Sequence, residues 1–101
     1  MDIRWTEKAS ADALGIFDYI AHQSLAYAES VYERILERPS QLTDHPLSGS
    51  VVPEVGREDV REVFVYSFRL IYRVADDEIR VLTVIHGSRM LAPESLGEAE
   101  Q

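Results

Sequence analysis

Residues 60–86 read VREVFVYSFRLIYRVADDEIRVLTVIH, and this stretch decides the fold class of the chain. Its apolar side chains recur at every second position, which is the period of a β-strand that has one face in the core. Breaks in the alternation divide the stretch into three predicted strands, at residues 60–66, 68–74 and 79–86. Because only short links join them, we expect the three strands to pair antiparallel.

The residues before this stretch have the period of helices instead. Apolar residues at steps of three and four predict a helix over about 7–22, with Thr6 as its N-cap. A second amphipathic helix follows, and Ser24 is its predicted N-cap. Pro39 should end or kink this helix, but Leu42 continues the same apolar stripe, which indicates a kink and one further turn.

The remaining segments complete an α+β domain. Ile3 and Trp5 lie on one side of a short first strand, and residues 43–59, with two prolines and two glycines, form a long connection. The order is therefore β-α-α-β-β-β, with a helical hairpin packed on one face of an antiparallel sheet. We expect residues 1–92 to form this single domain and residues 93–101 to be an acidic, disordered tail.

Composition limits the class of protein further. The chain has 101 residues, no cysteine and no apolar run that could span a membrane, so we expect a cytoplasmic protein without disulfides. Lys and Arg number 10 against 18 Asp and Glu, which gives a net charge of −8. Strong stand-alone binding to nucleic acid is not expected at this charge, because neutralising phosphates supplies the affinity of such proteins. An anion site would have to be local, in the arginine-bearing second half.

No cofactor or metal site is indicated by the motifs. The sequence has no glycine-rich phosphate loop and no HExxH motif. Asp18 and His22 are four positions apart on the first predicted helix, a spacing that could hold a metal ion but is more typical of a solvated helix face. His45 precedes a proline in the long connection and is interpreted as a turn residue. We expect neither cofactor nor metal.

The remaining chemistry-bearing residues are cations of the second half: Arg61, Arg69, Arg73, His86 and Arg89. Alternation puts Arg69 and Arg73 on one face of their strand, the solvent-facing one, and His86 and Arg89 would close the row at the end of the last strand. An imidazole and a guanidinium placed together can contact a phosphate. Alternatively, the arginines pair with the nearby Asp59 or Glu62 and only keep that face of the sheet hydrated. The residues alone leave both interpretations open.

Several segments resemble toxins of the RelE/ParE superfamily of type II toxin–antitoxin systems. They are WTEKA at 5–9, FDYI at 17–20, VREVFV at 60–65, SFRLIYRV at 67–74 and VLTVIHGSR at 81–89. The resemblance covers about residues 3–91. It implies a small α+β toxin that a cognate antitoxin, encoded beside it, holds silent.

The superfamily has two main activities, and the resemblance implies a different role for the cations in each. RelE-like members are ribosome-dependent mRNA endonucleases. In such an enzyme Arg69 and Arg89 would hold the scissile phosphate, and His86 would be the general acid or base. ParE-like members are described as gyrase poisons and are not known to be enzymes. In such a toxin Arg69 and Arg89 would be contacts to the target or structural pairs of Glu62 and Asp59. Arg61 and Arg73 are further candidates for contacts to the target or partner.

Departures from the RelE pattern favour the ParE-like branch. The paired lysines of RelE-like enzymes fall on Val60 and Glu62 here, and their C-terminal tyrosine has no counterpart after Arg89. A carboxylate at such a site opposes the negative charge that builds up on a phosphate during cleavage. The acidic net charge points the same way. We therefore expect a gyrase-directed toxin, with an mRNA endonuclease or a non-toxic antitoxin-binding relative as alternatives.

Overall fold

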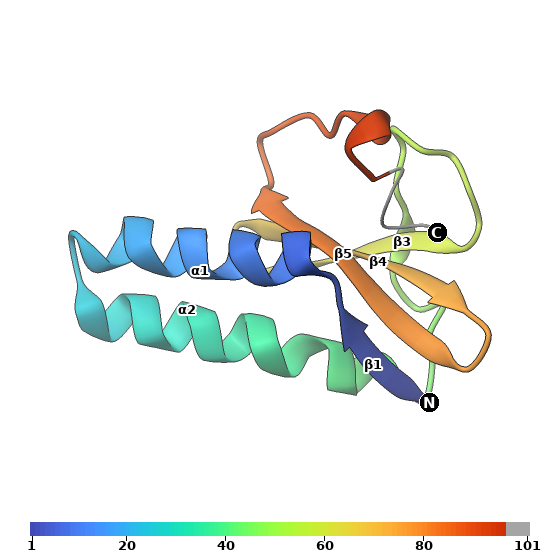
Figure 1. Cartoon of the computed structure of the whole chain (residues 1–101), viewed down its shortest axis with the longest axis horizontal. Coiled ribbons are helices and arrows are strands. Elements are labelled where there is room, and N and C mark those ends of the chain that lie inside the picture. Colours follow the sequence, from blue (N-terminus) through green and yellow to red (C-terminus); the bar gives the residue numbers. More distant parts are fainter. Residues whose placement is uncertain (97–101) are drawn as a thin grey trace.

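The computed structural model describes residues 1–96 as two helices packed on a five-stranded sheet (Figure 1). In chain order the elements are β1 (Asp2–Trp5), α1 (Glu7–Ala21), α2 (Leu25–Glu37), the 3-10 helix η1 (Arg38–Leu42), β2 (Ser50–Val51), β3 (Val60–Val65), β4 (Phe68–Ala75), β5 (Glu78–His86) and the 3-10 helix η2 (Pro93–Leu96). The predicted α+β class and helical hairpin are confirmed. The short strand β2 is an addition to the predicted order.

Both helices begin at the predicted caps. The Thr6 hydroxyl accepts a hydrogen bond from the Ala9 backbone N–H at 3.1 Å, and the Ser24 hydroxyl accepts one from the Tyr27 N–H at 3.1 Å. These bonds satisfy backbone donors that the first turn of a helix leaves without a partner. After α2 the chain continues as η1, whose Leu42 is fully buried, so the predicted further turn is present.

The sheet has the strand order β1-β5-β4-β3-β2. Strands β3, β4 and β5 pair antiparallel as predicted, whereas β1 pairs parallel with β5, with Ile3 opposite Ile79. Strand β2 pairs antiparallel with β3, and its Ser50 lies opposite Glu62. Two residues are too few to show a period of two, so this strand was not distinguished within the predicted connection 43–59.

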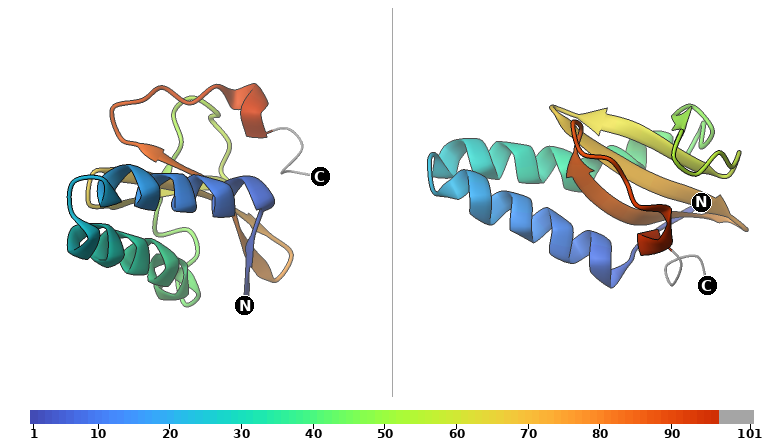
Figure 2. Two further views of the ribbon diagram at one scale, coloured as in Figure 1. Left: turned by 60° about the vertical axis from the view of Figure 1, so that its left-hand side comes forward. Right: turned by 90° about the horizontal axis from the view of Figure 1, so that it is seen from above.

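One face of the sheet is covered by the helical hairpin (Figure 2). The core between them contains alanines of α1, aliphatic residues of α2 and apolar residues of the strands: Ala9, Ala13, Val31, Ile35, Leu42, Val63, Val65, Leu70, Tyr72, Ile79, Val81 and Val84. Small alanines on α1 let this helix approach the sheet closely. The periodicities predicted this core except in the second half of β5, where a register shift puts Val84 on the helix side.

The face of the sheet opposite the helices was predicted to be solvent-exposed, and this prediction is wrong. The loop between β2 and β3 and the segment after β5 both lie over it (Figures 1 and 2), and a second core forms beneath them. Its buried members are Val52, Val60, Ile71, Leu82, Leu91 and Leu96. Leu96 is 1% exposed, so the packed structure extends through η2 and past the predicted boundary at residue 92. The rest of the predicted tail, residues 97–101, lies outside the described residues.

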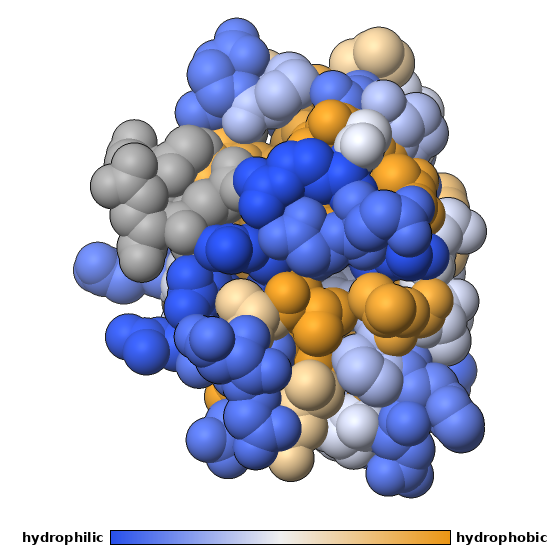
Figure 3. Space-filling model, turned by 90° about the vertical axis from the view of Figure 1, so that its right-hand side faces the viewer, coloured by the Kyte–Doolittle hydropathy of each residue, from blue (hydrophilic) through white to orange (hydrophobic). Residues whose placement is uncertain are grey.

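The surface at the end of the molecule farthest from the α1–α2 turn is largely hydrophilic, with apolar side chains showing only in small areas between charged ones (Figure 3). This distribution agrees with a composition of 28% charged residues. Within residues 1–96, none of the helices is long and apolar enough to cross a lipid bilayer.

Candidate functional site

The five predicted cations do not form one row. Strand register places Arg69 opposite Phe64 and Ile85, on the face that carries the second core. His86 lies opposite Phe68, which packs against the helix-side core. Side chains of opposite residues in an antiparallel pair lie on the same face, so Arg69 and His86 lie on opposite faces of the sheet. The predicted alignment of these two residues is therefore wrong.

Arg69 is also buried rather than solvent-facing, with 6% of the residue exposed. Its two terminal nitrogens each donate to one oxygen of the Glu54 carboxylate at 2.9 Å, and Nε donates to Glu62 Oε1 at 2.6 Å. Nη1 also donates to the backbone oxygen of Arg89 at 3.1 Å. The guanidinium is thus enclosed by two carboxylates and a carbonyl.

The charges of this cluster stabilise one another. Hydrogen bonds from Arg69, and then from the Leu91 backbone N–H, lower the pKa of Glu54 from 4.5 to about 2, outweighing the opposite effect of burial. The hydrogen bond with Glu54 raises the pKa of Arg69 in turn. Glu54 and Arg69 are therefore both charged at neutral pH. Glu54 was not singled out in the sequence, because it lies in the connection, 15 residues from its partner.

Arg61 and Arg73 also hold parts of the fold together. Arg61 lies on the helix side of β3, where Nη1 donates to the Gly49 backbone oxygen at 3.1 Å and Nε to the Glu58 oxygen at 2.8 Å. Arg73 forms an ion pair with Asp59, with 3.1 Å between Nε and Oδ2. The pair of Arg73 with Asp59 matches the alternative in which the arginines pair with Asp59 or Glu62, whereas Arg61 bonds Glu58 and Gly49 instead. Their roles as partner contacts stay predictions.

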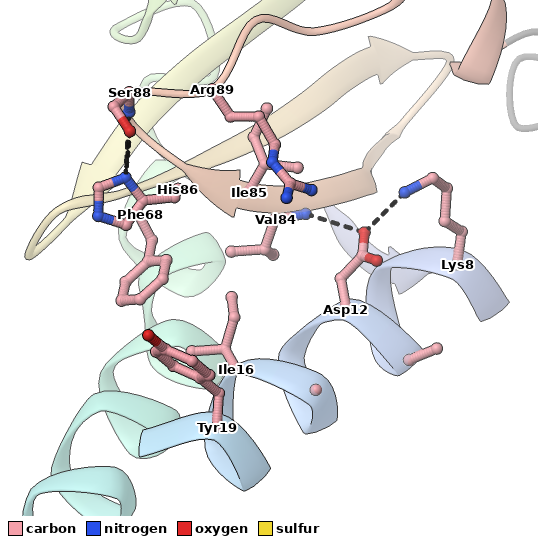
Figure 4. Close-up of a pocket in the computed structure, with 12 residues that line it drawn as sticks. Lys8, Asp12, Ile16, Tyr19, Phe68, Val84, Ile85, His86, Ser88 and Arg89 are labelled. Atoms are coloured by element: carbon pink, nitrogen blue, oxygen red, sulfur yellow. Dashed lines mark hydrogen bonds and ion pairs between the residues drawn. The ribbon is translucent and has the colours of Figure 1, made fainter.

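His86 and Arg89 are brought together at a groove between α1 and the end of β5 (Figure 4). This α1–β5 groove has a volume of about 870 Å³. It is lined from α1 by Lys8, Ala11, Asp12, Gly15, Ile16 and Tyr19, and from the sheet side by Phe68, Val84, Ile85, His86, Ser88 and Arg89. Polar and apolar side chains line the groove in about equal share, so it offers both apolar surface and hydrogen-bonding groups to a ligand or peptide.

The imidazole of His86 has a defined orientation and tautomer. The Ser88 backbone N–H donates to Nδ1 at 3.2 Å, so Nδ1 is the acceptor and the neutral ring carries its proton on Nε2. The Ser88 hydroxyl lies 2.8 Å from the same nitrogen. The ring packs edge-to-face on Phe68, with 5.5 Å between centroids. His86 can therefore present a donor N–H at the rim of the groove.

Arg89 differs from the other predicted arginines because its side chain is exposed and extends from the turn toward α1 (Figure 4). Within residues 1–96, no carboxylate or carbonyl pairs with its guanidinium. A guanidinium beside apolar walls is suited to bind a carboxylate or phosphate of a partner.

Asp12 lines the groove and joins α1 to the edge of β5, a contact that the sequence did not reveal. Its Oδ2 accepts from the Val84 backbone N–H at 3.3 Å and from Lys8 Nζ at 3.0 Å, and the Thr83 hydroxyl donates to it as well. Strand β1 ends at Trp5, opposite Val81, so residues 82–86 of β5 have no strand neighbour on that edge. Asp12 of α1 accepts the hydrogen bond of the Val84 backbone N–H there instead. No local pattern in the sequence signals this contact, because it depends on where α1 lies against the sheet.

The histidine and aspartate that are four residues apart on α1 make an ordinary helix contact. His22 Nδ1 lies 2.7 Å from the backbone oxygen of Asp18, not from its carboxylate. Among residues 1–96, no three His, Cys, Asp or Glu side chains are grouped in a way that could hold a metal ion.

The sequence model of the ParE toxin of the type II toxin–antitoxin system parDE matches residues 3–91. The chain belongs to the ParE toxin family. Among solved structures, this ParE-family toxin is similar to a chain of the chromosomal ParDE toxin–antitoxin system from P. aeruginosa, with 27% identity and a TM-score of 0.70. The match covers 85% of this chain and 95% of that one. The predicted superfamily and its ParE-like branch are therefore confirmed.

Two other structures share the fold of this ParE-family toxin. They are the YoeB dimer of Staphylococcus aureus, with 13% identity and a TM-score of 0.58, and the heterotetrameric YoeB–YefM toxin–antitoxin complex of the same organism, with 13% identity and a TM-score of 0.54. Each match covers 85% of this chain and 95% of the other. A comparison with curated protein sequences found no significant match.

Proposed function

We propose that this ParE-family toxin acts in the cytoplasm by binding a protein target, DNA gyrase, and that a cognate antitoxin neutralises it by covering the α1–β5 groove. Family membership supports the toxin–antitoxin part of the proposal. The choice of a protein target over mRNA cleavage rests on the surroundings of Arg69.

Arg69 is the residue that would hold the scissile phosphate in a RelE-like enzyme. Here Glu54 and Glu62 occupy its donors, and a pKa of about 2 for Glu54 keeps that carboxylate charged at neutral pH. A phosphate brought to this position would meet two negative charges instead of a free cation. His86 lies on the opposite face of the sheet, so the three groups of a ribonuclease site do not converge.

A ribonuclease function remains the second candidate because of His86 and Arg89. Both line the same groove, one with an N–H donor and the other with a guanidinium that has no partner among residues 1–96. An enzyme built on these two groups would use His86 as the general acid or base and Arg89 as the phosphate ligand. It would lack the other cations on which RelE-like cleavage depends. Arg69 is bound by two carboxylates, and Val60 and Glu62 stand where RelE-like enzymes have paired lysines.

The groove also supports the antitoxin part of the proposal. Its apolar walls are suited to aliphatic side chains of a partner segment, and Arg89 is suited to a carboxylate on that segment. Tyr19, at the groove rim, is 75% exposed and would gain an apolar contact. The acidic net charge implies that shape and a local ion pair matter more than overall attraction. Co-expression with each neighbouring open reading frame should yield a co-purifying complex, and the absence of any such complex would contradict this part.

The target is tested by inducing the chain without antitoxin. Gyrase inhibition should produce a DNA-damage response, filamentous cells and cleaved DNA trapped on gyrase, while translation initially continues. Early translation arrest, with ribosome-dependent cuts mapped within codons, would establish the ribonuclease instead. Unaffected growth would leave a non-toxic relative that only binds antitoxin.

Matched variants sharpen this experiment. His86→Ala should change gyrase-directed toxicity little, but it should lower a ribonuclease activity by about 10²-fold or more. His22→Ala, at an exposed helix end, is the control for removing a histidine, and Arg4→Ala is the control for Arg89→Ala. Thermal midpoints of all four variants show whether a loss of toxicity reflects unfolding.

A further inference from the structure

The turn that follows β5 is held from the face opposite the groove. Arg69 Nη1 donates to the backbone oxygen of Arg89 at 3.1 Å, and the Leu91 backbone N–H donates to Glu54 Oε2 at 3.0 Å. Glu54 and Arg69 are themselves joined by two hydrogen bonds of 2.9 Å. Three segments that are far apart in the chain therefore meet at one cluster: the loop after β2, strand β4 and the turn 87–91.

These bonds lie in a largely dry environment. The exposed fraction of the side chain is 7% for Arg69, 11% for Glu54 and 13% for Glu62. Hydrogen bonds between charged groups gain strength where water is excluded, and they are directional, so they fix the geometry of what they join. Apolar packing of Leu91 against the second core holds the same turn without fixing its register.

The turn presents different groups to the two sides of the sheet. Its backbone at Arg89 is bound to the cluster, while the Arg89 side chain extends toward α1 and lines the groove. The position of the guanidinium in the groove thus depends on bonds made on the opposite face. The proposed function uses the bonds between Arg69 and the carboxylates only to argue against a phosphate site, and it assigns no role to the bonds that hold the turn.

We propose that Arg69 and Glu54 are positioning residues that form a latch on the turn 87–91 and thereby set where Arg89 stands in the α1–β5 groove. The latch also couples the loop after β2 to the groove, although no residue of that loop lines it. The effect on partner binding rests on the proposed function, whereas the latch itself does not.

Glu62 provides a matched control. It contacts the same arginine, with 2.6 Å between Arg69 Nε and Oε1, but its carboxylate makes no bond to the turn. Removing either carboxylate leaves Arg69 with the other carboxylate and the Arg89 carbonyl, so neither variant leaves an unpaired guanidinium. Only the loss of Glu54 removes the acceptor of the Leu91 N–H.

The latch is tested by amide hydrogen exchange on the full-length chain. In Glu54→Ala the Leu91 amide should exchange at least about tenfold faster than in the wild type, because a hydrogen bond to a charged acceptor is lost. Glu54→Gln keeps an oxygen for that amide and should restore part of the protection. In Glu62→Ala the Leu91 amide should stay within about twofold of the wild type, and β4 amides should be unchanged in all three. Unchanged Leu91 exchange in Glu54→Ala, or equal acceleration in Glu62→Ala, overturns the latch.

Antitoxin affinity, measured by calorimetry, tests the consequence for Arg89. The Kd of Glu54→Ala should lie between those of the wild type and Arg89→Ala, and the double variant should bind no more weakly than Arg89→Ala alone, because both changes act through one guanidinium. Wild-type affinity of Glu54→Ala despite fast Leu91 exchange would overturn the positioning role. If the wild-type chain binds no antitoxin, that part of the proposed function fails, and the exchange measurement still decides whether the latch exists.

Discussion

Gly15 offers a way to block the α1–β5 groove without weakening the fold. It lies in the middle of α1 and lines the groove, and a Cβ built on it has no heavy atom within 4 Å. It has no positive φ, so a side chain there is not strained. We therefore consider Gly15→Leu, which places a branched apolar side chain in the space that a partner segment would occupy.

The change should increase stability. Glycine in a helix interior is about 0.8–1.0 kcal/mol less favourable than alanine, and leucine is close to alanine, so the gain is about 0.7 kcal/mol. For a domain of this size that corresponds to a rise in Tm of about 3–6 °C. Partner binding should fall at the same time, because the leucine side chain excludes the partner from the groove.

The measurement combines a thermal melt, the antitoxin Kd by calorimetry and a growth assay. Ser10→Leu is the control, since Ser10 is exposed on the same helix but does not line the groove. We expect the control to keep wild-type affinity and toxicity, and Gly15→Leu to lose at least tenfold in affinity. A Gly15→Leu protein with a raised Tm and wild-type affinity would show that the groove is not the antitoxin site.

Three further predictions concern stability. Because the folded-state pKa of Glu54 is lowered to about 2, its contribution to the free energy of unfolding is complete above about pH 4.5 and is lost as the pH falls toward 2. Urea unfolding of the wild type should therefore show a loss of about 2 kcal/mol over that range, which Glu54→Gln should lack. Equal pH slopes in both proteins would contradict this prediction. Tyr72→Phe removes a buried hydroxyl that accepts from the Gly49 N–H at 3.2 Å, so the free energy of unfolding should fall by about 1–3 kcal/mol; an unchanged denaturation midpoint would refute the inferred bond. Gly87→Ala would place a Cβ 2.9 Å from a backbone oxygen and 2.9 Å from a ring carbon, so we expect about 1–3 kcal/mol of destabilisation, and a Tm equal to the wild type would mean that the turn relaxes freely.

The fold was readable from the sequence because its cores follow simple periods. Alternation through β3, β4 and β5 places Leu70 and Tyr72 under the helices, and the caps Thr6 and Ser24 mark where the helices begin. Features that depend on segments without a period were missed. Strand β2 has two residues, and the second core is partly built by loops, in which Val52 and Leu96 lie in segments that have no period of apolar residues.

The candidate site was predicted in part for the same reason. Sequence position correctly put His86 and Arg89 near each other, since they follow one strand. Whether Arg69 is solvent-exposed or buried depends on the loop between β2 and β3 that lies over it. Its partner Glu54 belongs to that loop. Alternation tells which residues share a face, but it does not tell what covers the face. A β-bulge also separated these two residues: simple pairing from the turn after Ala75 would put His86 opposite Ser67, on the face of Arg69, but the register shifts between Ile71 and Tyr72, so His86 lies opposite Phe68.

Through Asp12, helix α1 covers part of the β5 edge, and this has a consequence for solubility. By binding the Val84 N–H, it occupies the part of the β5 edge that the short strand β1 leaves open. An unoccupied strand edge is a template for pairing with another chain. A variant without this carboxylate would keep both cores and much of its thermal stability. It would, however, expose an unpaired part of the β5 edge, including the Val84 N–H. The effect would then appear in concentrated samples as oligomers and precipitate, and their amount would increase with the fraction of time that α1 is separated from the β5 edge.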